Sequence, residues 1–288
     1  MLPDFIMMIY KYAAHRVLLI AALLGFIFPQ VAFSQTVFEK SILDQINGII
    51  KSPEKGGVSE LSPNDAPQGV MIPSGWGGSG ASLFGGIGGS YPQVYTHSPD
   101  LSGSVGACIG NPVTAVNFAA SLNIANLSSL NNYSANFVLS KKVFAGSSIS
   151  AGGLQLFASP IHSDAAGSTY FVAFSHAIQS VPSKTPGTSK LSYTIGVGNG
   201  RFLHKSPTDI AKGKGKYGTA IFGSLSYEVI QHINLNAEWS GVNLGFSLGV
   251  KPFKTPLSVG LGVTNLTSYS SDKPNMVFSI GYPLSLVR

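Results

Sequence analysis

The sequence has little charge and only one long apolar run. Charged residues make up 10% of the 288 residues, against roughly 25% in ordinary soluble domains, while 44% are hydrophobic. After Phe28, no stretch approaches the roughly 20 apolar residues that a membrane-spanning helix needs. An apolar chain without helical spans has one other way to cross a membrane, a closed β-barrel, because pairing between strands then satisfies every backbone hydrogen bond.

Cysteine is almost absent as well. Cys108 is the single cysteine, which excludes an intramolecular disulfide and a zinc site of the cysteine type. We find no metal-ligand spacing, and the glycine-rich stretch Gly75–Gly80 lacks the lysine and helix of a phosphate-binding loop. We therefore expect no metal and no cofactor. The formal net charge of +6 is moderate and does not indicate a nucleic-acid partner.

The N-terminal region has the pattern of an export signal. Lys11 and Arg16 precede an apolar run of twelve residues, Val17–Phe28, and the small residues Ala32 and Ser34 follow. This order is typical of a secretory signal peptide cleaved after Ser34. We expect residues 1–34 to be this signal, 35–70 an amphipathic helix (37–51) with a linker, and 71–288 a barrel.

Beyond residue 71, large apolar residues alternate with small or polar ones. A period of two is typical of a strand with one apolar face, and most segments approach the roughly 9 to 11 residues that a tilted strand needs to cross a bilayer. We expect twelve strands at 80–89, 101–110, 113–124, 133–144, 148–159, 168–178, 191–197, 217–230, 233–240, 242–250, 257–263 and 276–286. The alternation breaks step between Ala151 and Leu154 in the 148–159 segment, and we expect a β-bulge at Gly152–Gly153.

Short turns alternate with longer loops between these segments, as in outer-membrane barrels. The predicted fold is therefore all-β: a transmembrane antiparallel up-and-down barrel of about twelve strands, preceded by a short amphipathic helix. The alternative is a soluble β-sandwich.

The final strand carries a second signal. Ser279, Gly281, Leu284 and Leu286 follow the order polar residue, glycine, then two spaced hydrophobic residues. This order resembles the terminal-strand assembly signal of bacterial outer-membrane barrels, although those chains usually end on an aromatic residue. The chain from about residue 100 to 285 also resembles an uncharacterised group of such barrels, through Gly196–Phe202 and Leu235–Gly245. This resemblance implies a fold and a location in the outer membrane, and no activity.

The residues opposite the apolar faces are mostly small, and we expect them to leave a water-filled lumen. Ionisable and amide side chains on this inner face are the candidates for a functional role, since such groups are costly inside a membrane segment. The lumen candidates are Glu228, Glu238, Lys142, Lys251, Asn234 and Asn236. The alternative is that the charged groups pair with one another or lie in water near a mouth. Because few basic residues lie at the level of the two glutamates, we expect a weak preference for cations.

One loop is strongly basic. Its basic residues are Arg201, Lys205, Lys212, Lys214 and Lys216, around a single acid, Asp209. They are candidates for binding lipopolysaccharide phosphates or for attracting anions. The alternative is a solvated, mobile loop.

Catalysis is not expected. Asn199–Arg201 matches part of a motif found in outer-membrane lipases, but the preceding residues supply neither nucleophile nor base. Ser175 and His176 are adjacent on a strand, so their side chains point to opposite faces. His162, Ser163 and Asp164 are merely neighbours in one loop.

The sequence thus favours a bacterial outer-membrane barrel acting as a small passive pore or solute channel. The alternative is a structural, assembly or partner-docking component without transport activity. The expected partners are outer-membrane lipids, including lipopolysaccharide, and the barrel-assembly machinery.

Overall fold

A computed structural model describes residues 60–92, 100–124, 127, 132–158, 167–252, 255–267 and 273–286 of the protein. The expected signal peptide, the 37–51 helix and the 162–164 loop lie outside these residues.

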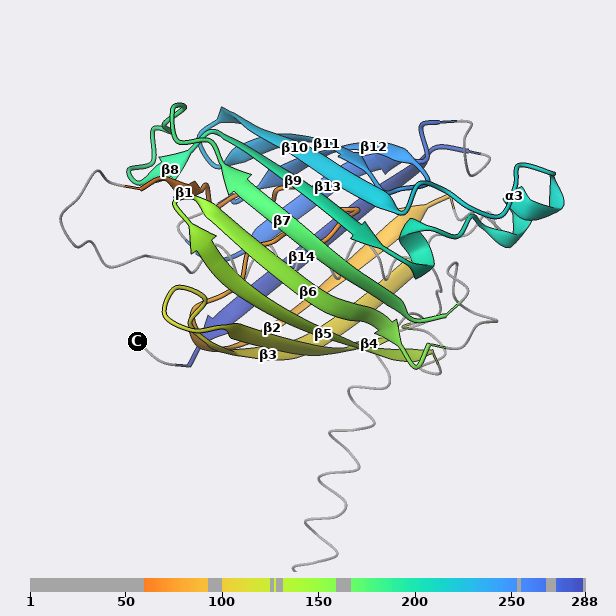
Figure 1. Ribbon diagram of the computed structural model, residues 1–288, viewed down its shortest axis with the longest axis horizontal. Coiled ribbons are helices and arrows are strands. Elements are labelled where there is room, and N and C mark those ends of the chain that lie inside the picture. Colours follow the sequence, from red (N-terminus) through yellow and green to blue (C-terminus); the bar gives the residue numbers. More distant parts are fainter. Residues whose placement is uncertain are drawn as a thin grey trace, which may run out of the picture.

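Twelve antiparallel strands close into one barrel (Figure 1). They follow the chain order around the wall, and β14 closes the barrel by pairing with β2 from Met276↔Tyr91 to Ser285↔Ser82. The barrel strands are β2 (Gly80–Tyr91), β3 (Asp100–Gly110), β4 (Asn117–Ile124), β5 (Tyr133–Phe144), β6 (Ser147–Leu156), β7 (Thr169–Ala177), β9 (Leu191–Gly198), β10 (Ile221–Ile230), β11 (Ile233–Trp239), β12 (Leu244–Val250), β13 (Ser258–Thr264) and β14 (Asn275–Ser285). The predicted twelve-stranded antiparallel barrel is confirmed.

The remaining described elements are short. Strand β1 (Ser62–Pro63) pairs in parallel with β8 (Thr188–Ser189) apart from the barrel sheet. A 3-10 helix, η1 (Gly200–Phe202), and an α-helix, α3 (Pro207–Ala211), lie in the connection between β9 and β10. Among the described residues, no helix has the length and apolar character to cross a membrane.

The two ends of the barrel differ. At the end that we call the turn end, short connections such as 145–146 and 231–232 join the strands, and the Leu286 N–H donates to the Ala81 carbonyl at 2.9 Å. At the opposite loop end, the 199–220 connection projects with α3. In Figure 1, β1 and β8 lie at the left, at the turn end, and α3 lies at the right.

Alternation places apolar residues outside and small or polar residues inside, because successive side chains of a strand point to opposite faces. In β14, Met276 is 66% exposed and Ser279 is fully buried. Lys141 is the only lysine, arginine, aspartate or glutamate whose position in the described barrel strands faces outward. It lies near the turn end, where its Nζ donates to the Ala115 carbonyl at 2.7 Å.

The structure moves the predicted bulge of β6 and the predicted starts of β4 and β10. The register changes between Phe137↔Gly153 and Ala135↔Leu156, so the bulge lies at Leu154 and Gln155, later than the predicted Gly152–Gly153. The Asn136 side chain explains this position, because its Oδ1 accepts the displaced Gln155 N–H at 2.9 Å.

Strands β4 and β10 begin later than predicted because local turns use the preceding residues. Before β4, Asn111 Oδ1 accepts the Val113 N–H and the Asn111 carbonyl accepts the Ala115 N–H, both at 2.9 Å. Before β10, the Gly218 N–H donates to the Leu203 carbonyl at 2.6 Å, within the 199–220 connection.

The main departure from the sequence analysis is inside the barrel. Residues 64–79, which we call the lumen segment, run through the interior instead of forming an external linker. Residues 64–69, the ascending leg, contact β11 from the turn end upward, and Val70–Ile72 form the tip. Residues 73–79, the descending leg, return along β6 and β7 to Gly80. The boundary expected at residue 71 therefore falls at the tip of this segment.

Candidate functional site

The tip of the lumen segment is bound by a buried carboxylate. Glu238 of β11 is 1% exposed and points into the barrel. Its Oε1 accepts the Val70 N–H at 2.6 Å, and its Oε2 accepts the N–H groups of Met71 at 2.7 Å and Ile72 at 3.2 Å. The Ser247 hydroxyl adds a bond to Oε1 at 3.1 Å. Charge-assisted hydrogen bonds of this kind are stronger than neutral ones, so Glu238 fixes the tip to the wall.

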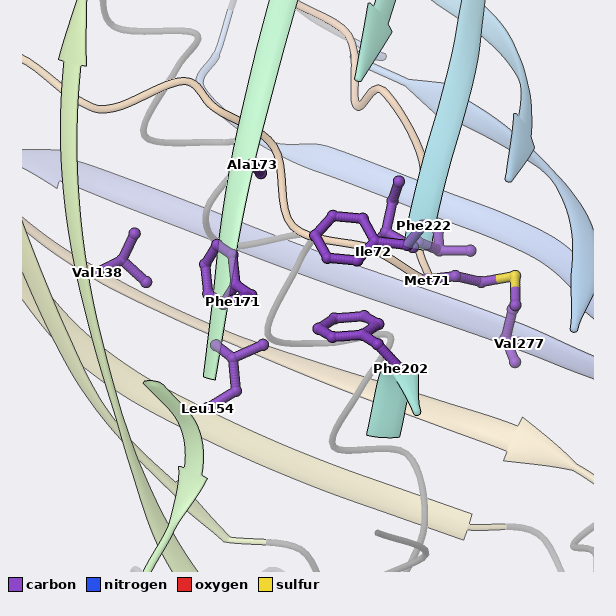
Figure 2. Packing of buried hydrophobic residues seen from close by; sticks show 10 residues of the cluster. Met71, Ile72, Val138, Leu154, Phe171, Ala173, Phe202, Phe222 and Val277 are labelled. Carbon is purple, nitrogen blue, oxygen red and sulfur yellow. The ribbon is translucent and has the colours of Figure 1, made fainter. Parts of the chain in front are cut away.

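An apolar cluster encloses the same tip (Figure 2). Phe222 of β10 and Phe202 of η1 are fully buried with Ile72, and their ring centroids lie 4.3 Å apart. Arg201 reaches the tip too, since its Nη2 donates to the Met71 carbonyl at 3.2 Å. Burial of each large apolar side chain stabilises the structure by about 2 kcal/mol. The cluster therefore forms a hydrophobic core inside the barrel.

The descending leg binds hydroxyl groups of the wall. The Ser150 hydroxyl donates to the Ser74 carbonyl, and the Ser175 hydroxyl accepts the Gly75 N–H, both at 2.7 Å. The two legs are also joined, because Trp76 Nε1 donates to Gln68 Oε1 at 3.1 Å. Such bonds satisfy the backbone of a segment that has no sheet partner.

Glycines of the wall make room for the ascending leg. A Cβ atom at Gly249 would overlap the Pro67 carbonyl oxygen, and one at Gly245 would overlap the Met71 sulfur. At Gly260 it would lie 2.9 Å from a Val70 methyl carbon. The space that the small inward residues leave at these three glycines is therefore filled by the lumen segment and not by water. The expected water-filled lumen is wrong at this part of the wall.

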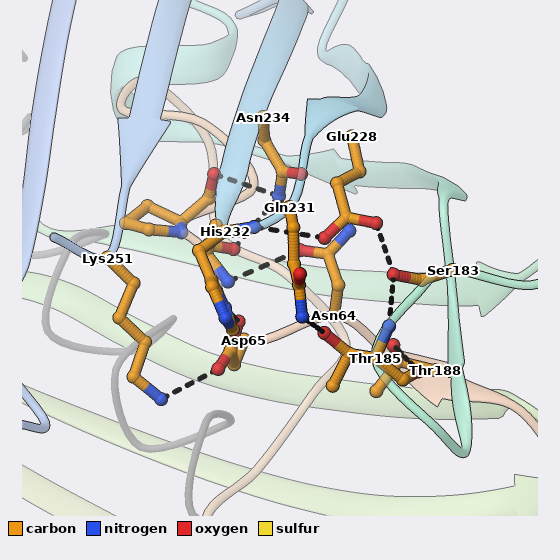
Figure 3. A network of polar contacts seen from close by, with 12 residues as sticks. Asn64, Asp65, Ser183, Thr185, Thr188, Glu228, Gln231, His232, Asn234 and Lys251 are labelled. Atoms are coloured by element: carbon orange, nitrogen blue, oxygen red, sulfur yellow. Dashed lines mark hydrogen bonds and ion pairs between the residues drawn. The ribbon is translucent and has the colours of Figure 1, made fainter. Parts of the chain in front are cut away.

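A polar network holds the ascending leg at the turn end (Figure 3). Asn234 Nδ2 donates to Asn64 Oδ1 at 2.7 Å. Asp65 accepts from His232 Nδ1 and from Lys251 Nζ, both at 2.8 Å. Burial raises the pKa of the Asp65 carboxyl, but the hydrogen bonds and charges of Lys251 and His232 outweigh this effect and hold the pKa below its ordinary value.

A second ion pair lies at the same end. Glu60 pairs with Lys142 at 2.5 Å, and its other oxygen accepts the Gly146 N–H. A cavity of about 30 Å³ beside this pair is lined in part by Trp76 and Pro112, and is large enough for one or two water molecules.

The structure places all six lumen candidates on the inner face and gives each a partner. Lys142, Lys251, Glu238 and Asn234 bind the lumen segment or Glu60 as described above. Asn236 Nδ2 donates to the Pro67 carbonyl at 3.3 Å, and Glu228 accepts from the Ser183 hydroxyl and from the His232 N–H. Both glutamates accept hydrogen bonds from neutral donors of the protein, and the expected weak cation preference stays a prediction.

The basic loop is folded, and its five basic residues have different surroundings. Arg201 points to the lumen, and Lys205 is buried with its Nζ donating to the Lys214 carbonyl at 2.6 Å. Lys214 pairs with the buried Asp209 at 3.1 Å. Lys212 and Lys216 remain on the exposed surface. The five residues therefore do not form one common anion site.

The proposed assembly residues occupy both faces of the barrel at β14. Ser279 and Gly281 face inward, whereas Leu284 and Leu286 are exposed on the outside. Their role in assembly stays a prediction.

Two features were missed from the sequence. Pro63, Pro67 and Pro73 interrupt the 60–79 stretch, and the buried Val70–Ile72 run between them was the available signal for an internal segment. Separately, Ser147 Oγ lies 2.6 Å from His176 Nδ1 across β6 and β7, a pairing that adjacency in sequence does not indicate. Among the described residues, no group of three or more His, Cys, Asp or Glu side chains could hold a metal ion.

No protein-family model matches the chain, and no curated protein matches its sequence. Among solved structures it is similar to KdgM porin, with 12% identity over 70% of this chain and 98% of that chain and a TM-score of 0.40. It is also similar to outer membrane phospholipase A from Escherichia coli (9% identity, 85% and 98% coverage, TM-score 0.38) and from Salmonella typhi (8%, 85% and 98%, 0.39). These similarities are too distant to carry an argument about function, so the fold rests on the strand pairing described above.

Proposed function

We propose that this chain is a bacterial outer-membrane β-barrel that acts as a small passive pore. The observation that carries the membrane location is the outward face of the closed barrel. Exposed apolar side chains cover it, and Lys141 near the turn end is its only formally charged residue of the described strands. In water such a surface would drive aggregation, whereas in a membrane the acyl chains of the lipids contact it in place of water.

Aromatic residues mark both rims of this apolar surface. At the loop end they are Tyr91, Tyr133, Tyr170 and Tyr217, and at the turn end Phe144, Tyr193, Tyr227 and Tyr282, each at least 36% exposed. Aromatic girdles at the two interfaces are typical of membrane barrels, since these rings favour the headgroup region.

The pore proposal rests on the inner wall. The lumen segment lies against β6, β7 and β11–β13, and at Gly77 also against Ser140 of β5 and Asn117 of β4. Nearer the loop end of β4 and β5, inward hydroxyl and amide groups bond one another. Asn136 Nδ2 donates to Ser121 Oγ at 3.1 Å, and Asn123 Nδ2 donates to Ser134 Oγ at 3.3 Å. This uncharged polar sector is the part of the wall along which small solutes would pass, with the lumen segment limiting the conductance.

One observation favours the alternative of a structural or docking component. The apolar cluster around Ile72 fills part of the interior with fully buried side chains, as in a barrel that does not conduct. In planar bilayers, the pore proposal predicts small, steady conductance steps from the purified protein. A silent barrel that inserts normally would favour the structural role.

Location is tested by fractionating the bacterial envelope. We expect recovery with the outer membrane and slower electrophoretic migration after heating, as the barrel unfolds. Recovery in the inner membrane or in the soluble fraction would contradict the proposal. In an outer-membrane protein, the barrel-assembly machinery would recognise β14. The exposed Lys212 and Lys216 would contact lipid phosphates.

The proposal assigns no catalytic role. The contacts of His176 are with Ser147, Phe144 and Tyr193 in the described part of the chain, and none supplies a carboxylate or amide to orient the imidazole. We expect no phospholipid hydrolysis in mixed micelles. Turnover that disappears in Ser147→Ala would instead establish an enzyme.

A further inference from the structure

The tip of the lumen segment is held from two sides. Glu238 holds it from β11, which is paired along its length with β10 and β12 and so belongs to the rigid wall. Arg201 and Phe202 hold it from the other side, and both belong to the 200–217 connection, which we call the lock loop.

The lock loop is braced as one unit. The Arg201 N–H donates to Thr169 Oγ1 at 3.1 Å, and an isolated bridge pairs His204 with Tyr217. Further out, Lys205 donates to the Lys214 carbonyl and Lys214 pairs with Asp209. Because these bonds tie the projecting part to η1, a displacement of the loop would be transmitted to Phe202.

The contacts of the lumen segment differ in strength between the turn end of the barrel and the tip of the segment. At the turn end, the side chains of Asp65 and Lys251 are 20% and 19% exposed, and Glu60 and Lys142 are 31% and 24% exposed. Such partly solvated ion pairs contribute little and are screened by salt. At the loop end, Phe202, Phe222 and Ile72 are fully buried, so truncation there leaves a cavity in a packed core.

We infer that the lock loop is the gate element of the lumen: it keeps the tip of the lumen segment in place, and its displacement, not the rupture of the turn-end ion pairs, begins opening. This regulation rests on the proposed pore. The wall side of the tip stays fixed at Glu238, while the lock loop is the side that can move. Opening would expose the surface of β7 and β10 that the cluster covers.

A thiol buried in the cluster reports this movement. Ala173 of β7 faces inward, is fully buried and belongs to the cluster. In a Cys108→Ser background, Ala173→Cys leaves one thiol, because Cys108 is the single cysteine of the sequence. The labelling rate with a soluble maleimide then measures exposure of the cluster in the folded, detergent-solubilised protein.

We compare Phe202→Ala and Arg201→Gln with Lys251→Gln as the turn-end control. Labelling should accelerate about tenfold or more in Phe202→Ala, less in Arg201→Gln and less than about twofold in Lys251→Gln, since a buried aromatic ring contributes more than an exposed ion pair. Heat-modifiable migration confirms that each variant is folded. Arg201→Gln leaves the apolar cluster intact and covers the case in which Phe202→Ala does not fold.

Equal acceleration in the loop-end and turn-end variants, or faster labelling in Lys251→Gln, would overturn the inference. Conductance separates it from the proposed function. If labelling rises as expected while no variant conducts ions in planar bilayers, the pore proposal fails and the role of the lock loop stands. If steady conductance is unaffected by Phe202→Ala and labelling is unchanged, the pore stands and the lock fails.

Discussion

Glu238 is an ionisable residue in the membrane-spanning part of the wall whose hydrogen bonds all lie within the protein. Three consecutive backbone N–H groups and a serine hydroxyl converge on its two oxygens. A buried carboxylate is stable there because donors replace the lost water, and the donors in turn would be left unsatisfied without it. Its role is therefore to position the lumen segment.

Replacing Glu238 by glutamine tests this role. An amide presents N–H groups where the tip needs an acceptor, so we expect a loss of about 1 to 3 kcal/mol of stability. Acrylamide quenching of Trp76 should rise in a Trp239→Phe background, in which Trp76 is the only tryptophan. The matched control is Glu228→Gln, because Glu228 binds Ser183 and His232 instead of the lumen segment. Equal quenching in both variants would contradict the assigned role.

Gly249 tests the fit between the wall and the ascending leg. A methyl group there would overlap the Pro67 carbonyl oxygen, whereas one at Gly85 would lie 3.5 Å from its nearest neighbour, an ordinary contact. We expect Gly249→Ala to lower the free energy of unfolding by about 1 to 3 kcal/mol and Gly85→Ala to change it little. Urea unfolding in lipid vesicles measures both. Similar values for the two variants would show that the leg is not tightly seated.

At the scale of elements, the lumen segment depends on pH at its turn end. The folded-state pKa of Asp65 is lowered, so its contribution to stability is present above the unfolded pKa of about 4 and is lost as the pH falls through the lower folded value. We expect Trp76 quenching to stay constant from neutral pH to about pH 4 on account of Asp65, and to rise in stronger acid.

Another carboxylate lies at the same end, that of Glu60 beside Lys142. Asp65→Asn is therefore the control: it should show more quenching at neutral pH and a smaller rise in acid. An acid transition identical in both proteins would assign the effect to another group.

The sequence predicted the strands well because the alternation of apolar and small residues is local to each strand and can be recognised without knowing its partners. Apolar residues such as Leu225 and Tyr227 of β10 face outward, as the alternation requires. The lumen segment could not be predicted in this way, because its prolines and glycines resemble those of an exposed linker. Its partners also lie far along the chain, 76 residues away for Ser74 and Ser150 and 168 for Val70 and Glu238. Inward glycines likewise indicate space, and periodicity does not say whether water or chain fills it.

At the scale of the whole molecule, the outward surface distinguishes a membrane protein from a soluble one. Leu225 lies near the middle of β10 and is 53% exposed, while Leu286 follows β14 at the rim and is 56% exposed. In a bilayer, Leu225→Arg should cost about 2 to 4 kcal/mol and Leu286→Asp about 1 kcal/mol or less. In water, both exposed substitutions would fall within about 0.5 kcal/mol of the parent. Unfolding in vesicles measures the difference, and equal small effects would argue against a membrane location.

The two ends of the lumen segment lie at the same mouth of the barrel. Glu60 binds Gly146 there, and Gly80 pairs with Gly110 where β2 begins. The segment is thus a finger inserted through one opening, and it never passes from one mouth to the other. A segment of this kind can enter or leave a closed barrel without threading a chain end and without separating any two paired strands. Its insertion therefore does not depend on when β14 pairs with β2.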